Sequence, residues 1–155
     1  MTEADKVAIS RMRVSEIMTQ NVKTATSSQS LSDVAAMMRD GDMGAVPVVD
    51  DGRFVGIVTD RDIVVRGIAI GSTTDSPIGA VMTTELFTVT PEDFVFEAVR
   101  LMGDKQVRRV PVVKADRSLA GIISMADIAL EMEDGQAIDE TLEEISSGTA
   151  FWSKN

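Results

Sequence analysis

Two stretches of the chain share one pattern of apolar and polar positions. Residues 56–63 and 121–128 each begin with a glycine and two aliphatic residues, reach a hydroxyl residue, and carry a carboxylate three positions later. The aliphatic run predicts a buried strand. The hydroxyl and the carboxylate fit a capping box, in which each accepts a backbone N–H at a helix start. The pattern therefore predicts, twice, a strand that leads directly into a helix, with the pairs Thr59/Asp62 and Ser124/Asp127 at the junctions.

The preceding residues of the first half predict a helix followed by a hairpin. Apolar residues at helical spacing predict a helix over residues 30–39, with Gly41 as its left-handed stop. Residues 45–49 and 53–59 predict two strands joined by an Asp-Gly turn. Pro47 has no backbone donor, so we expect it at a strand start or edge.

Three shorter elements complete the first half. Residues 14–18 predict one helical turn with Ser15 as its N-cap. Residues 21–25 predict a short extended piece, and residues 60–68 a second helix. These elements mix helices and strands, which is an α+β fold.

The second half of the chain repeats the first. An offset of 64 residues aligns Pro111 with Pro47, and an offset of 65 then aligns Asp127 with Asp62. Self-similarity over this length indicates a duplicated unit. One copy alone is too small to bury a large core, so we expect the two repeats to pair about a pseudo-two-fold axis with two related clefts. The expected divisions are an N-terminal arm (1–13), repeat 1 (14–70), a linker (71–76), repeat 2 (77–130) and an acidic tail (131–155).

The composition removes most of the usual catalytic groups. The 155 residues include no cysteine, histidine or tyrosine. Disulfides, thiolate metal sites and cysteine nucleophiles are therefore excluded, and so are the commonest general base and metal ligand. We expect a protein that is not an enzyme and needs no cofactor.

The net charge of −10 argues against binding to nucleic acid or to an anionic membrane. No apolar run is long enough to span a membrane, and the N-terminal residues do not resemble a signal peptide. We expect a cytoplasmic protein. Residues 131–155 carry seven acidic residues and one lysine, with apolar residues at helical spacing, and predict an acidic amphipathic helix. Its apolar side could cover the protein's own body, a second copy or a client protein.

The ordered set of motifs, present twice, resembles the CBS domain in a tandem pair (a Bateman module) over roughly residues 10–130. Short stand-alone bacterial CBS proteins of the hypoxic-response type are the most similar. This resemblance implies a β-α-β-β-α fold for each repeat and a disc-like homodimer. It also implies adenosine-containing ligands such as AMP, ADP, ATP or S-adenosylmethionine, with any Mg²⁺ arriving on the phosphates of ATP. The motifs that carry it are Ile17-Met18-Thr19, the strand starts at Thr24 and Thr88, Val46-Pro47-Val48-Val49, Val110-Pro111-Val112-Val113 and the two Gly-to-Asp stretches, with residues 56–67 and 106–111 closest to the hypoxic-response type.

The resemblance also implies two nucleotide sites. In each, the Asp accepts both ribose hydroxyls, because a carboxylate is an acceptor only and can take two O–H donors. Two adjacent arginines before Pro111 suit phosphate, so a phosphorylated ligand should prefer cleft A. These arginines could instead lie solvated on the surface or pair with acids at a dimer interface. Cleft A comprises Thr59, Asp62, Arg61, Leu86, Phe87, Thr88, Arg108, Arg109 and Pro111, and cleft B comprises Ser124, Asp127, Val22, Lys23, Thr24, Ala45 and Pro47.

Two functions follow from this sequence. The first is a regulatory module that senses an adenosine ligand and signals to an unknown client protein in trans. The second is a structural or protein-interaction module whose clefts no longer bind nucleotide. Met18, Met38, Met82 and Met102 occupy equivalent positions in the repeats and are expected in the cores, while Asp50-Asp51 is expected as a solvated turn rather than a metal site.

Overall fold

The computed structural model describes residues 2–131, and the predicted tail helix therefore lies outside the described residues. Within this range the chain forms two compact units. Unit 1 contains residues 2–21, 87–115 and 120–131, and unit 2 contains residues 22–86 and 116–119. Neither unit is continuous in sequence, because the segment that opens each repeat belongs to the unit built mainly from the other repeat.

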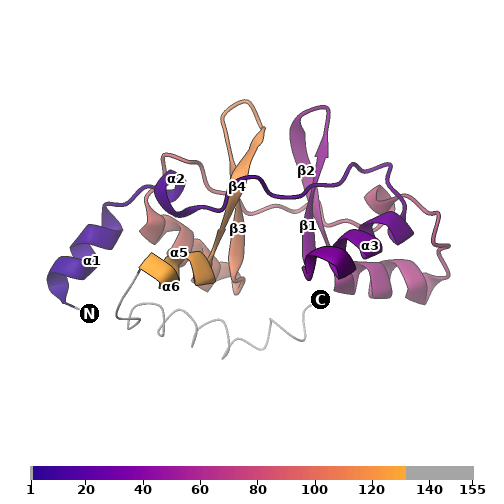
Figure 1. Cartoon of the computed structure of the whole chain (residues 1–155), viewed down its shortest axis with the longest axis horizontal. Coiled ribbons are helices and arrows are strands. Elements are labelled where there is room, and N and C mark those ends of the chain that lie inside the picture. The colour runs from indigo at the N-terminus through magenta and orange to yellow at the C-terminus, as the bar shows by residue number, and fades with distance from the viewer. Residues whose placement is uncertain (1, 132–155) are drawn as a thin grey trace. The chain divides into compact units, whose positions relative to one another are not determined.

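Unit 2 is built on the hairpin of β1 (Ala45–Asp50) and β2 (Arg53–Thr59), with α3 (Leu31–Gly41) beside it (Figure 1). The strands pair antiparallel, and the predicted first strand of the repeat is a single parallel bridge from Ala25 to Val48. Pro47 lies inside β1 and is buried, and its carbonyl accepts the N–H of Ala25.

A helical segment of changing pitch follows β2. It comprises α4 (Asp60–Asp62), the π-helix η1 (Ile63–Gly67) and the 3₁₀ turn η2 (Ile68–Ile70). The sequence predicted a single helix here. The short 3₁₀ turn η3 (Ile78–Ala80) completes the unit, and its N-cap is Pro77.

Unit 1 repeats this plan. Its hairpin is β3 (Arg109–Val113) and β4 (Leu119–Ser124), with α5 (Val95–Lys105) and α6 (Met125–Glu131) beside it (Figure 1). The parallel bridge from Val89 to Val112 matches the one in unit 2. The N-terminal helices α1 (Glu3–Ser10) and α2 (Val14–Ile17) belong to this unit.

Each unit has its own apolar core. In unit 1, Val14 and Ile17 of α2 pack with Met102, Val110 and Ile128. In unit 2, helix α3 and the hairpin pack with Ile78 and Val81, which precede the second repeat's main body. Met38 and Met102 are buried, and Met18 and Met82 pack at the core margins, so the predicted core role of these four methionines is confirmed.

The helix starts explain why the opening segments are exchanged. The first N–H groups of a helix have no partner within it. In α3, the N–H of Leu31 donates to the carbonyl of Ser76, and in α5 the N–H of Val95 donates to the carbonyl of Met12. Met12 and Ser76 are 64 residues apart, so the same contact forms once in each unit.

Two predicted helix ends were wrong. The left-handed residue after α3 is Asp42 (φ 48°), not Gly41, which stays helical. Gln106 (φ 56°) ends α5 in the same way, so both helices end on a polar residue in the left-handed conformation. The N-cap of α2 is Arg13 rather than Ser15, and its N–H donates to Glu16 Oε2 at 2.6 Å.

Candidate functional site

Thr59 and Asp62 cap each other where β2 passes into α4. The N–H of Thr59 donates to Asp62 Oδ2 at 2.9 Å, and the N–H of Asp62 donates to Thr59 Oγ1 at 3.0 Å. The predicted capping box is confirmed. Thr59 uses only a lone pair in this bond, so its O–H remains a donor, and the carboxylate has roughly four acceptor positions in all.

Ser124 and Asp127 form the same arrangement where β4 passes into α6. Both backbone-to-side-chain bonds are 3.1 Å long, one from Ser124 N to Asp127 Oδ2 and one from Asp127 N to Ser124 Oγ. The second predicted capping box is therefore also confirmed. Both carboxylates are partly buried, which holds them in one orientation at the end of a strand.

A threonine from the start of the other repeat contacts each carboxylate. Thr83 Oγ1 donates to Asp62 Oδ2 at 3.4 Å, and Thr19 Oγ1 lies 3.1 and 3.2 Å from the two oxygens of Asp127. Sequence reasoning missed both threonines. They are 64 residues apart, so the alignment of the repeats contained a signal that could have found them.

The glycine of each motif leaves room for this threonine segment. A Cβ on Gly56 would lie 2.9 Å from the carbonyl oxygen of Thr83, and a Cβ on Gly121 would collide with the carbonyl oxygen of Thr19. Antiparallel bridges join Ile57 to Thr83 and Thr19 to Ile122 at these points. In each motif the glycine thus leaves room for the threonine segment, while the hydroxyl residue and the acid cap the helix start beside it.

Asp62 has a cationic neighbour that sequence reasoning also missed. Arg66 Nη1 lies 3.8 Å from Asp62 Oδ1, at the i,i+4 spacing typical of helical ion pairs. The spacing alone could have indicated it. The equivalent residue of repeat 2 is Glu131, so the two carboxylates differ in the charge of this neighbour.

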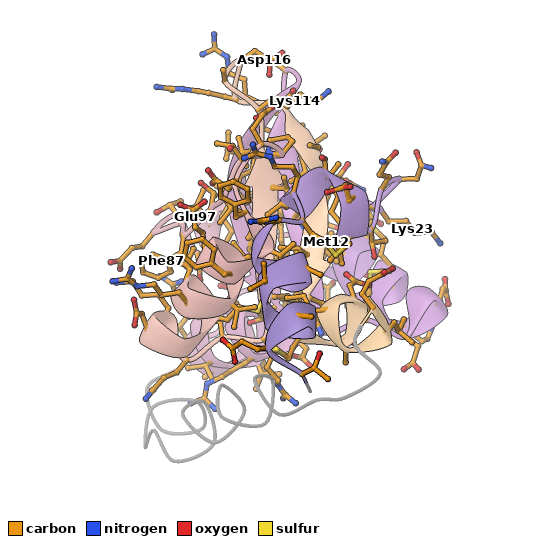
Figure 2. All side chains as sticks on the ribbon, turned by 90° about the vertical axis from the view of Figure 1, so that its left-hand side faces the viewer. Met12, Lys23, Phe87, Glu97, Lys114 and Asp116 are labelled. Atoms are coloured by element: carbon orange, nitrogen blue, oxygen red, sulfur yellow. The ribbon has the colours of Figure 1, made fainter. Side chains whose placement is uncertain are left out.

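The residues predicted for cleft A divide between the units. Thr59, Arg61, Asp62 and Leu86 belong to unit 2, and the others belong to unit 1. Phe87 lies at the α5 side of unit 1, as does Glu97 (Figure 2), with Lys105 Nζ 4.5 Å from the centre of its ring. The residues of cleft A in unit 1 are Phe87, Thr88, Arg108, Arg109 and Pro111.

Arg108 has a backbone contact that the sequence did not show. Its carbonyl accepts the N–H of Met125, the first residue of α6, at 2.8 Å. Within unit 1 this places the backbone of Arg108 beside the start of the helix that carries Asp127. In unit 2, the carbonyl of Gly44 accepts the N–H of Asp60 in the same manner.

The residues predicted for cleft B divide in the same way. Ser124 and Asp127 belong to unit 1. Lys23 and Thr24 are exposed in unit 2, whereas Pro47 is buried in β1. The residues of cleft B in unit 2 are Val22, Lys23, Thr24, Ala45 and Pro47.

A family model for the CBS domain matches residues 14–67 and again residues 78–134. The chain belongs to the CBS-domain family. This CBS pair is 37% identical over 138 residues to "Uncharacterized protein YlbB" of Bacillus subtilis, covering 88% of this chain and 93% of the relative. It is 35% identical over 138 residues to "Hypoxic response protein 1" of Mycobacterium tuberculosis, covering 88% and 95%. The predicted similarity to hypoxic-response proteins is confirmed.

Solved structures agree with this assignment of the CBS pair. A structure of Hypoxic Response Protein I with two coordinated zinc ions is 34% identical, has a TM-score of 0.71, and matches over 78% of this chain and 99% of that one. The CBS pair of protein MJ0100, in complex with 5′-methylthioadenosine and S-adenosyl-L-methionine, is 27% identical with a TM-score of 0.66, covering 77% and 94%. CBSX2 in complex with AMP has the same identity and coverage and a TM-score of 0.68.

One of these structures holds zinc, a metal that proteins commonly bind with cysteine and histidine. This CBS pair contains no cysteine or histidine. Within residues 2–131, no three acidic side chains gather closely enough to hold a metal ion. In the same part of the chain, no helix is both long and apolar enough to cross a membrane.

Proposed function

We propose that this CBS pair is a non-catalytic regulatory module that binds an adenosine-containing ligand, AMP, ADP or ATP, at Asp62 and Asp127 and signals to a client protein in trans. Each carboxylate accepts the two hydroxyls of a ribose. The observation that carries the proposal is the pair of matching capping boxes, which fix both carboxylates at strand ends. Similarity to CBS proteins solved with AMP and with S-adenosyl-L-methionine supports the adenosine class.

The residues assigned to cleft A and to cleft B from the sequence stay a prediction. The preference of a phosphorylated ligand for cleft A stays a prediction. Any Mg²⁺ arrives with the phosphates of ATP and needs no protein ligands of its own.

We propose a homodimer as the functional form, in the cytoplasm. Between residues 64 and 70, the side chains of Val64, Val65, Ile68 and Ile70 are 54%, 42%, 64% and 74% exposed. Contiguous exposed apolar side chains of this kind typically mark an interaction surface. A second copy of the chain is the occupant proposed for it.

Thermal unfolding with a panel of ligands tests the proposed function. A ligand that binds only the folded state raises the free energy of unfolding by about 2.7 kcal/mol when its concentration is 100 times its dissociation constant. We expect AMP, ADP or ATP to raise the melting temperature by several degrees and GTP to leave it unchanged. No shift with any adenosine compound would instead favour the structural or protein-interaction module.

A further inference from the structure

Arg66 lies at the Asp62 carboxylate and also touches the threonine that contacts it. Its Nη1 is 3.8 Å from Asp62 Oδ1, 3.5 Å from Thr83 Oγ1 and 3.4 Å from the carbonyl oxygen of Met82. All three partners belong to unit 2, so the whole cluster lies within that unit. A single guanidinium nitrogen therefore lies near the carboxylate, the threonine hydroxyl and a backbone carbonyl at once.

These contacts hold the guanidinium loosely. Charge-assisted N–H···O bonds are usually about 2.7–2.9 Å long, and every contact of Nη1 is longer. The Arg66 side chain is 52% exposed, whereas that of Asp62 is 13% exposed. A guanidinium has five N–H donors in a planar fork. Arg66 can therefore turn from the carboxylate to an anionic group of a ligand without losing a strong bond.

The backbone around Arg66 differs from its counterpart in repeat 2. Arg66 lies in the π-helix η1, where the N–H of Ile68 donates to the carbonyls of Ile63 and Val64. Single π turns inside helices are frequent at functional sites. The corresponding residues 128–131 of repeat 2 lie in α6 and are α-helical, and Glu131 is the counterpart of Arg66. The cation and its π turn thus occur at Asp62 and are replaced by an acid at Asp127.

We propose that Arg66 determines the charge of the ligand accepted at Asp62. It neutralises the carboxylate when the site is empty, and it donates to the phosphate when a phosphorylated adenosine compound binds. Arg66 therefore favours AMP over adenosine at this site. This inference rests on the proposed function, because it assumes that Asp62 accepts a ribose.

Calorimetric titration with AMP and with adenosine tests the role of Arg66. The titrations use D127N, so that Asp62 is the remaining carboxylate site, and are repeated on the otherwise unaltered chain. We expect Arg66→Gln to weaken AMP binding about tenfold, as for a lost hydrogen bond to a charged group, and to change adenosine binding by less than about twofold. Arg66→Lys should restore part of the loss because it keeps the charge.

Arg39→Gln is the matched control. Arg39 lies in the last turn of α3, pairs with the exposed Asp40, and gives the same change of net charge when replaced. We expect it to leave the ratio of AMP to adenosine affinity unchanged. An equal ratio in Arg66→Gln and the parent chain would overturn the role of Arg66 while leaving the proposed function intact. If neither compound binds the unaltered chain, the proposed function fails instead.

Discussion

The hydroxyl of Thr19 lies 3.1 Å from Oδ1 and 3.2 Å from Oδ2 of Asp127, which is 108 residues further along the chain. The same segment pairs with β4 through reciprocal backbone bonds between Thr19 and Ile122. The acid that caps α6 is therefore held from two sides, once by its own helix start and once by the opening of the other repeat. Thr83 and Asp62 repeat this relationship in unit 2.

Thr19→Val should destabilise the protein by about 1 kcal/mol, since it removes one hydrogen bond but keeps the shape of the side chain. Urea unfolding followed by circular dichroism measures the change. Thr19→Ser is the control, because it retains the hydroxyl and should recover most of the stability. Equal stability of the Val and Ser variants would contradict a structural role for this bond.

Gly121→Ala should cost about 1–3 kcal/mol, because the added methyl group collides with the Thr19 carbonyl and forces the backbone to shift. Gly44→Ala is the matched control. A Cβ on Gly44 would meet its nearest atoms, those of Asp60, at 3.6 Å or more, which is ordinary contact. Urea unfolding should therefore show a clear loss for Gly121→Ala and little change for Gly44→Ala. Similar losses in both variants would contradict the steric explanation.

The local features of this fold could be predicted from the sequence. The spacing of Thr59 and Asp62 correctly predicted a capping box, because the hydroxyl, the acid and both backbone donors lie within four residues. The two strands around the Asp-Gly turn were predicted for the same reason, since β1 and β2 are neighbours along the chain. Because the second half of the chain repeats the first, each of these local predictions also applied to the equivalent residues of repeat 2.

Features that depend on distant contacts could not be predicted in this way. The exchange of opening segments joins Met12 to Val95, and nothing in the neighbourhood of either residue indicates it. The π turn at residues 63–67 was missed because one such turn is too short for its wider spacing to show in the apolar pattern. The left-handed Asp42 was missed because glycine, with no Cβ, is the commoner residue in that conformation.

Asp50 should make the stability of the protein depend on pH in the acid range. The hydroxyl of Ser27 (2.5 Å) and its backbone N–H (2.9 Å) donate to the carboxylate, and these bonds lower the pKa of Asp50 below its ordinary value of 3.8. A lowered pKa means that the stabilisation is complete above the ordinary value and is lost as pH falls through the pKa of the folded protein.

Asp50→Asn removes this dependence, so its melting temperature should be lower than that of the parent chain at pH 7 and approach it below pH 3. Thermal unfolding across this range measures the difference. Asp51→Asn makes the same change of charge at the next residue, whose φ of 49° asparagine tolerates. A constant difference between Asp50→Asn and the parent chain at every pH would contradict the assignment to Asp50.

Ile68→Asp should convert the proposed homodimer into a monomer, because it places a charge among the exposed apolar side chains of residues 64–70. Light scattering coupled to size-exclusion chromatography measures the mass. Ser32→Asp, which adds the same charge at an exposed position of α3, should leave the dimer intact. A dimer that survives Ile68→Asp would show that residues 64–70 are not its interface.

Calorimetric titration of AMP into the parent chain, D62N and D127N tests most directly whether Asp62 and Asp127 bind the ligand. Asparagine keeps one oxygen to accept the capping N–H of Thr59 or Ser124, so each variant retains its helix start while losing the charge and one acceptor. We expect AMP to bind the parent chain and each variant to lose the binding event at its own carboxylate, with the double variant D62N/D127N losing both. AMP binding that persists unchanged in the double variant would contradict this expectation.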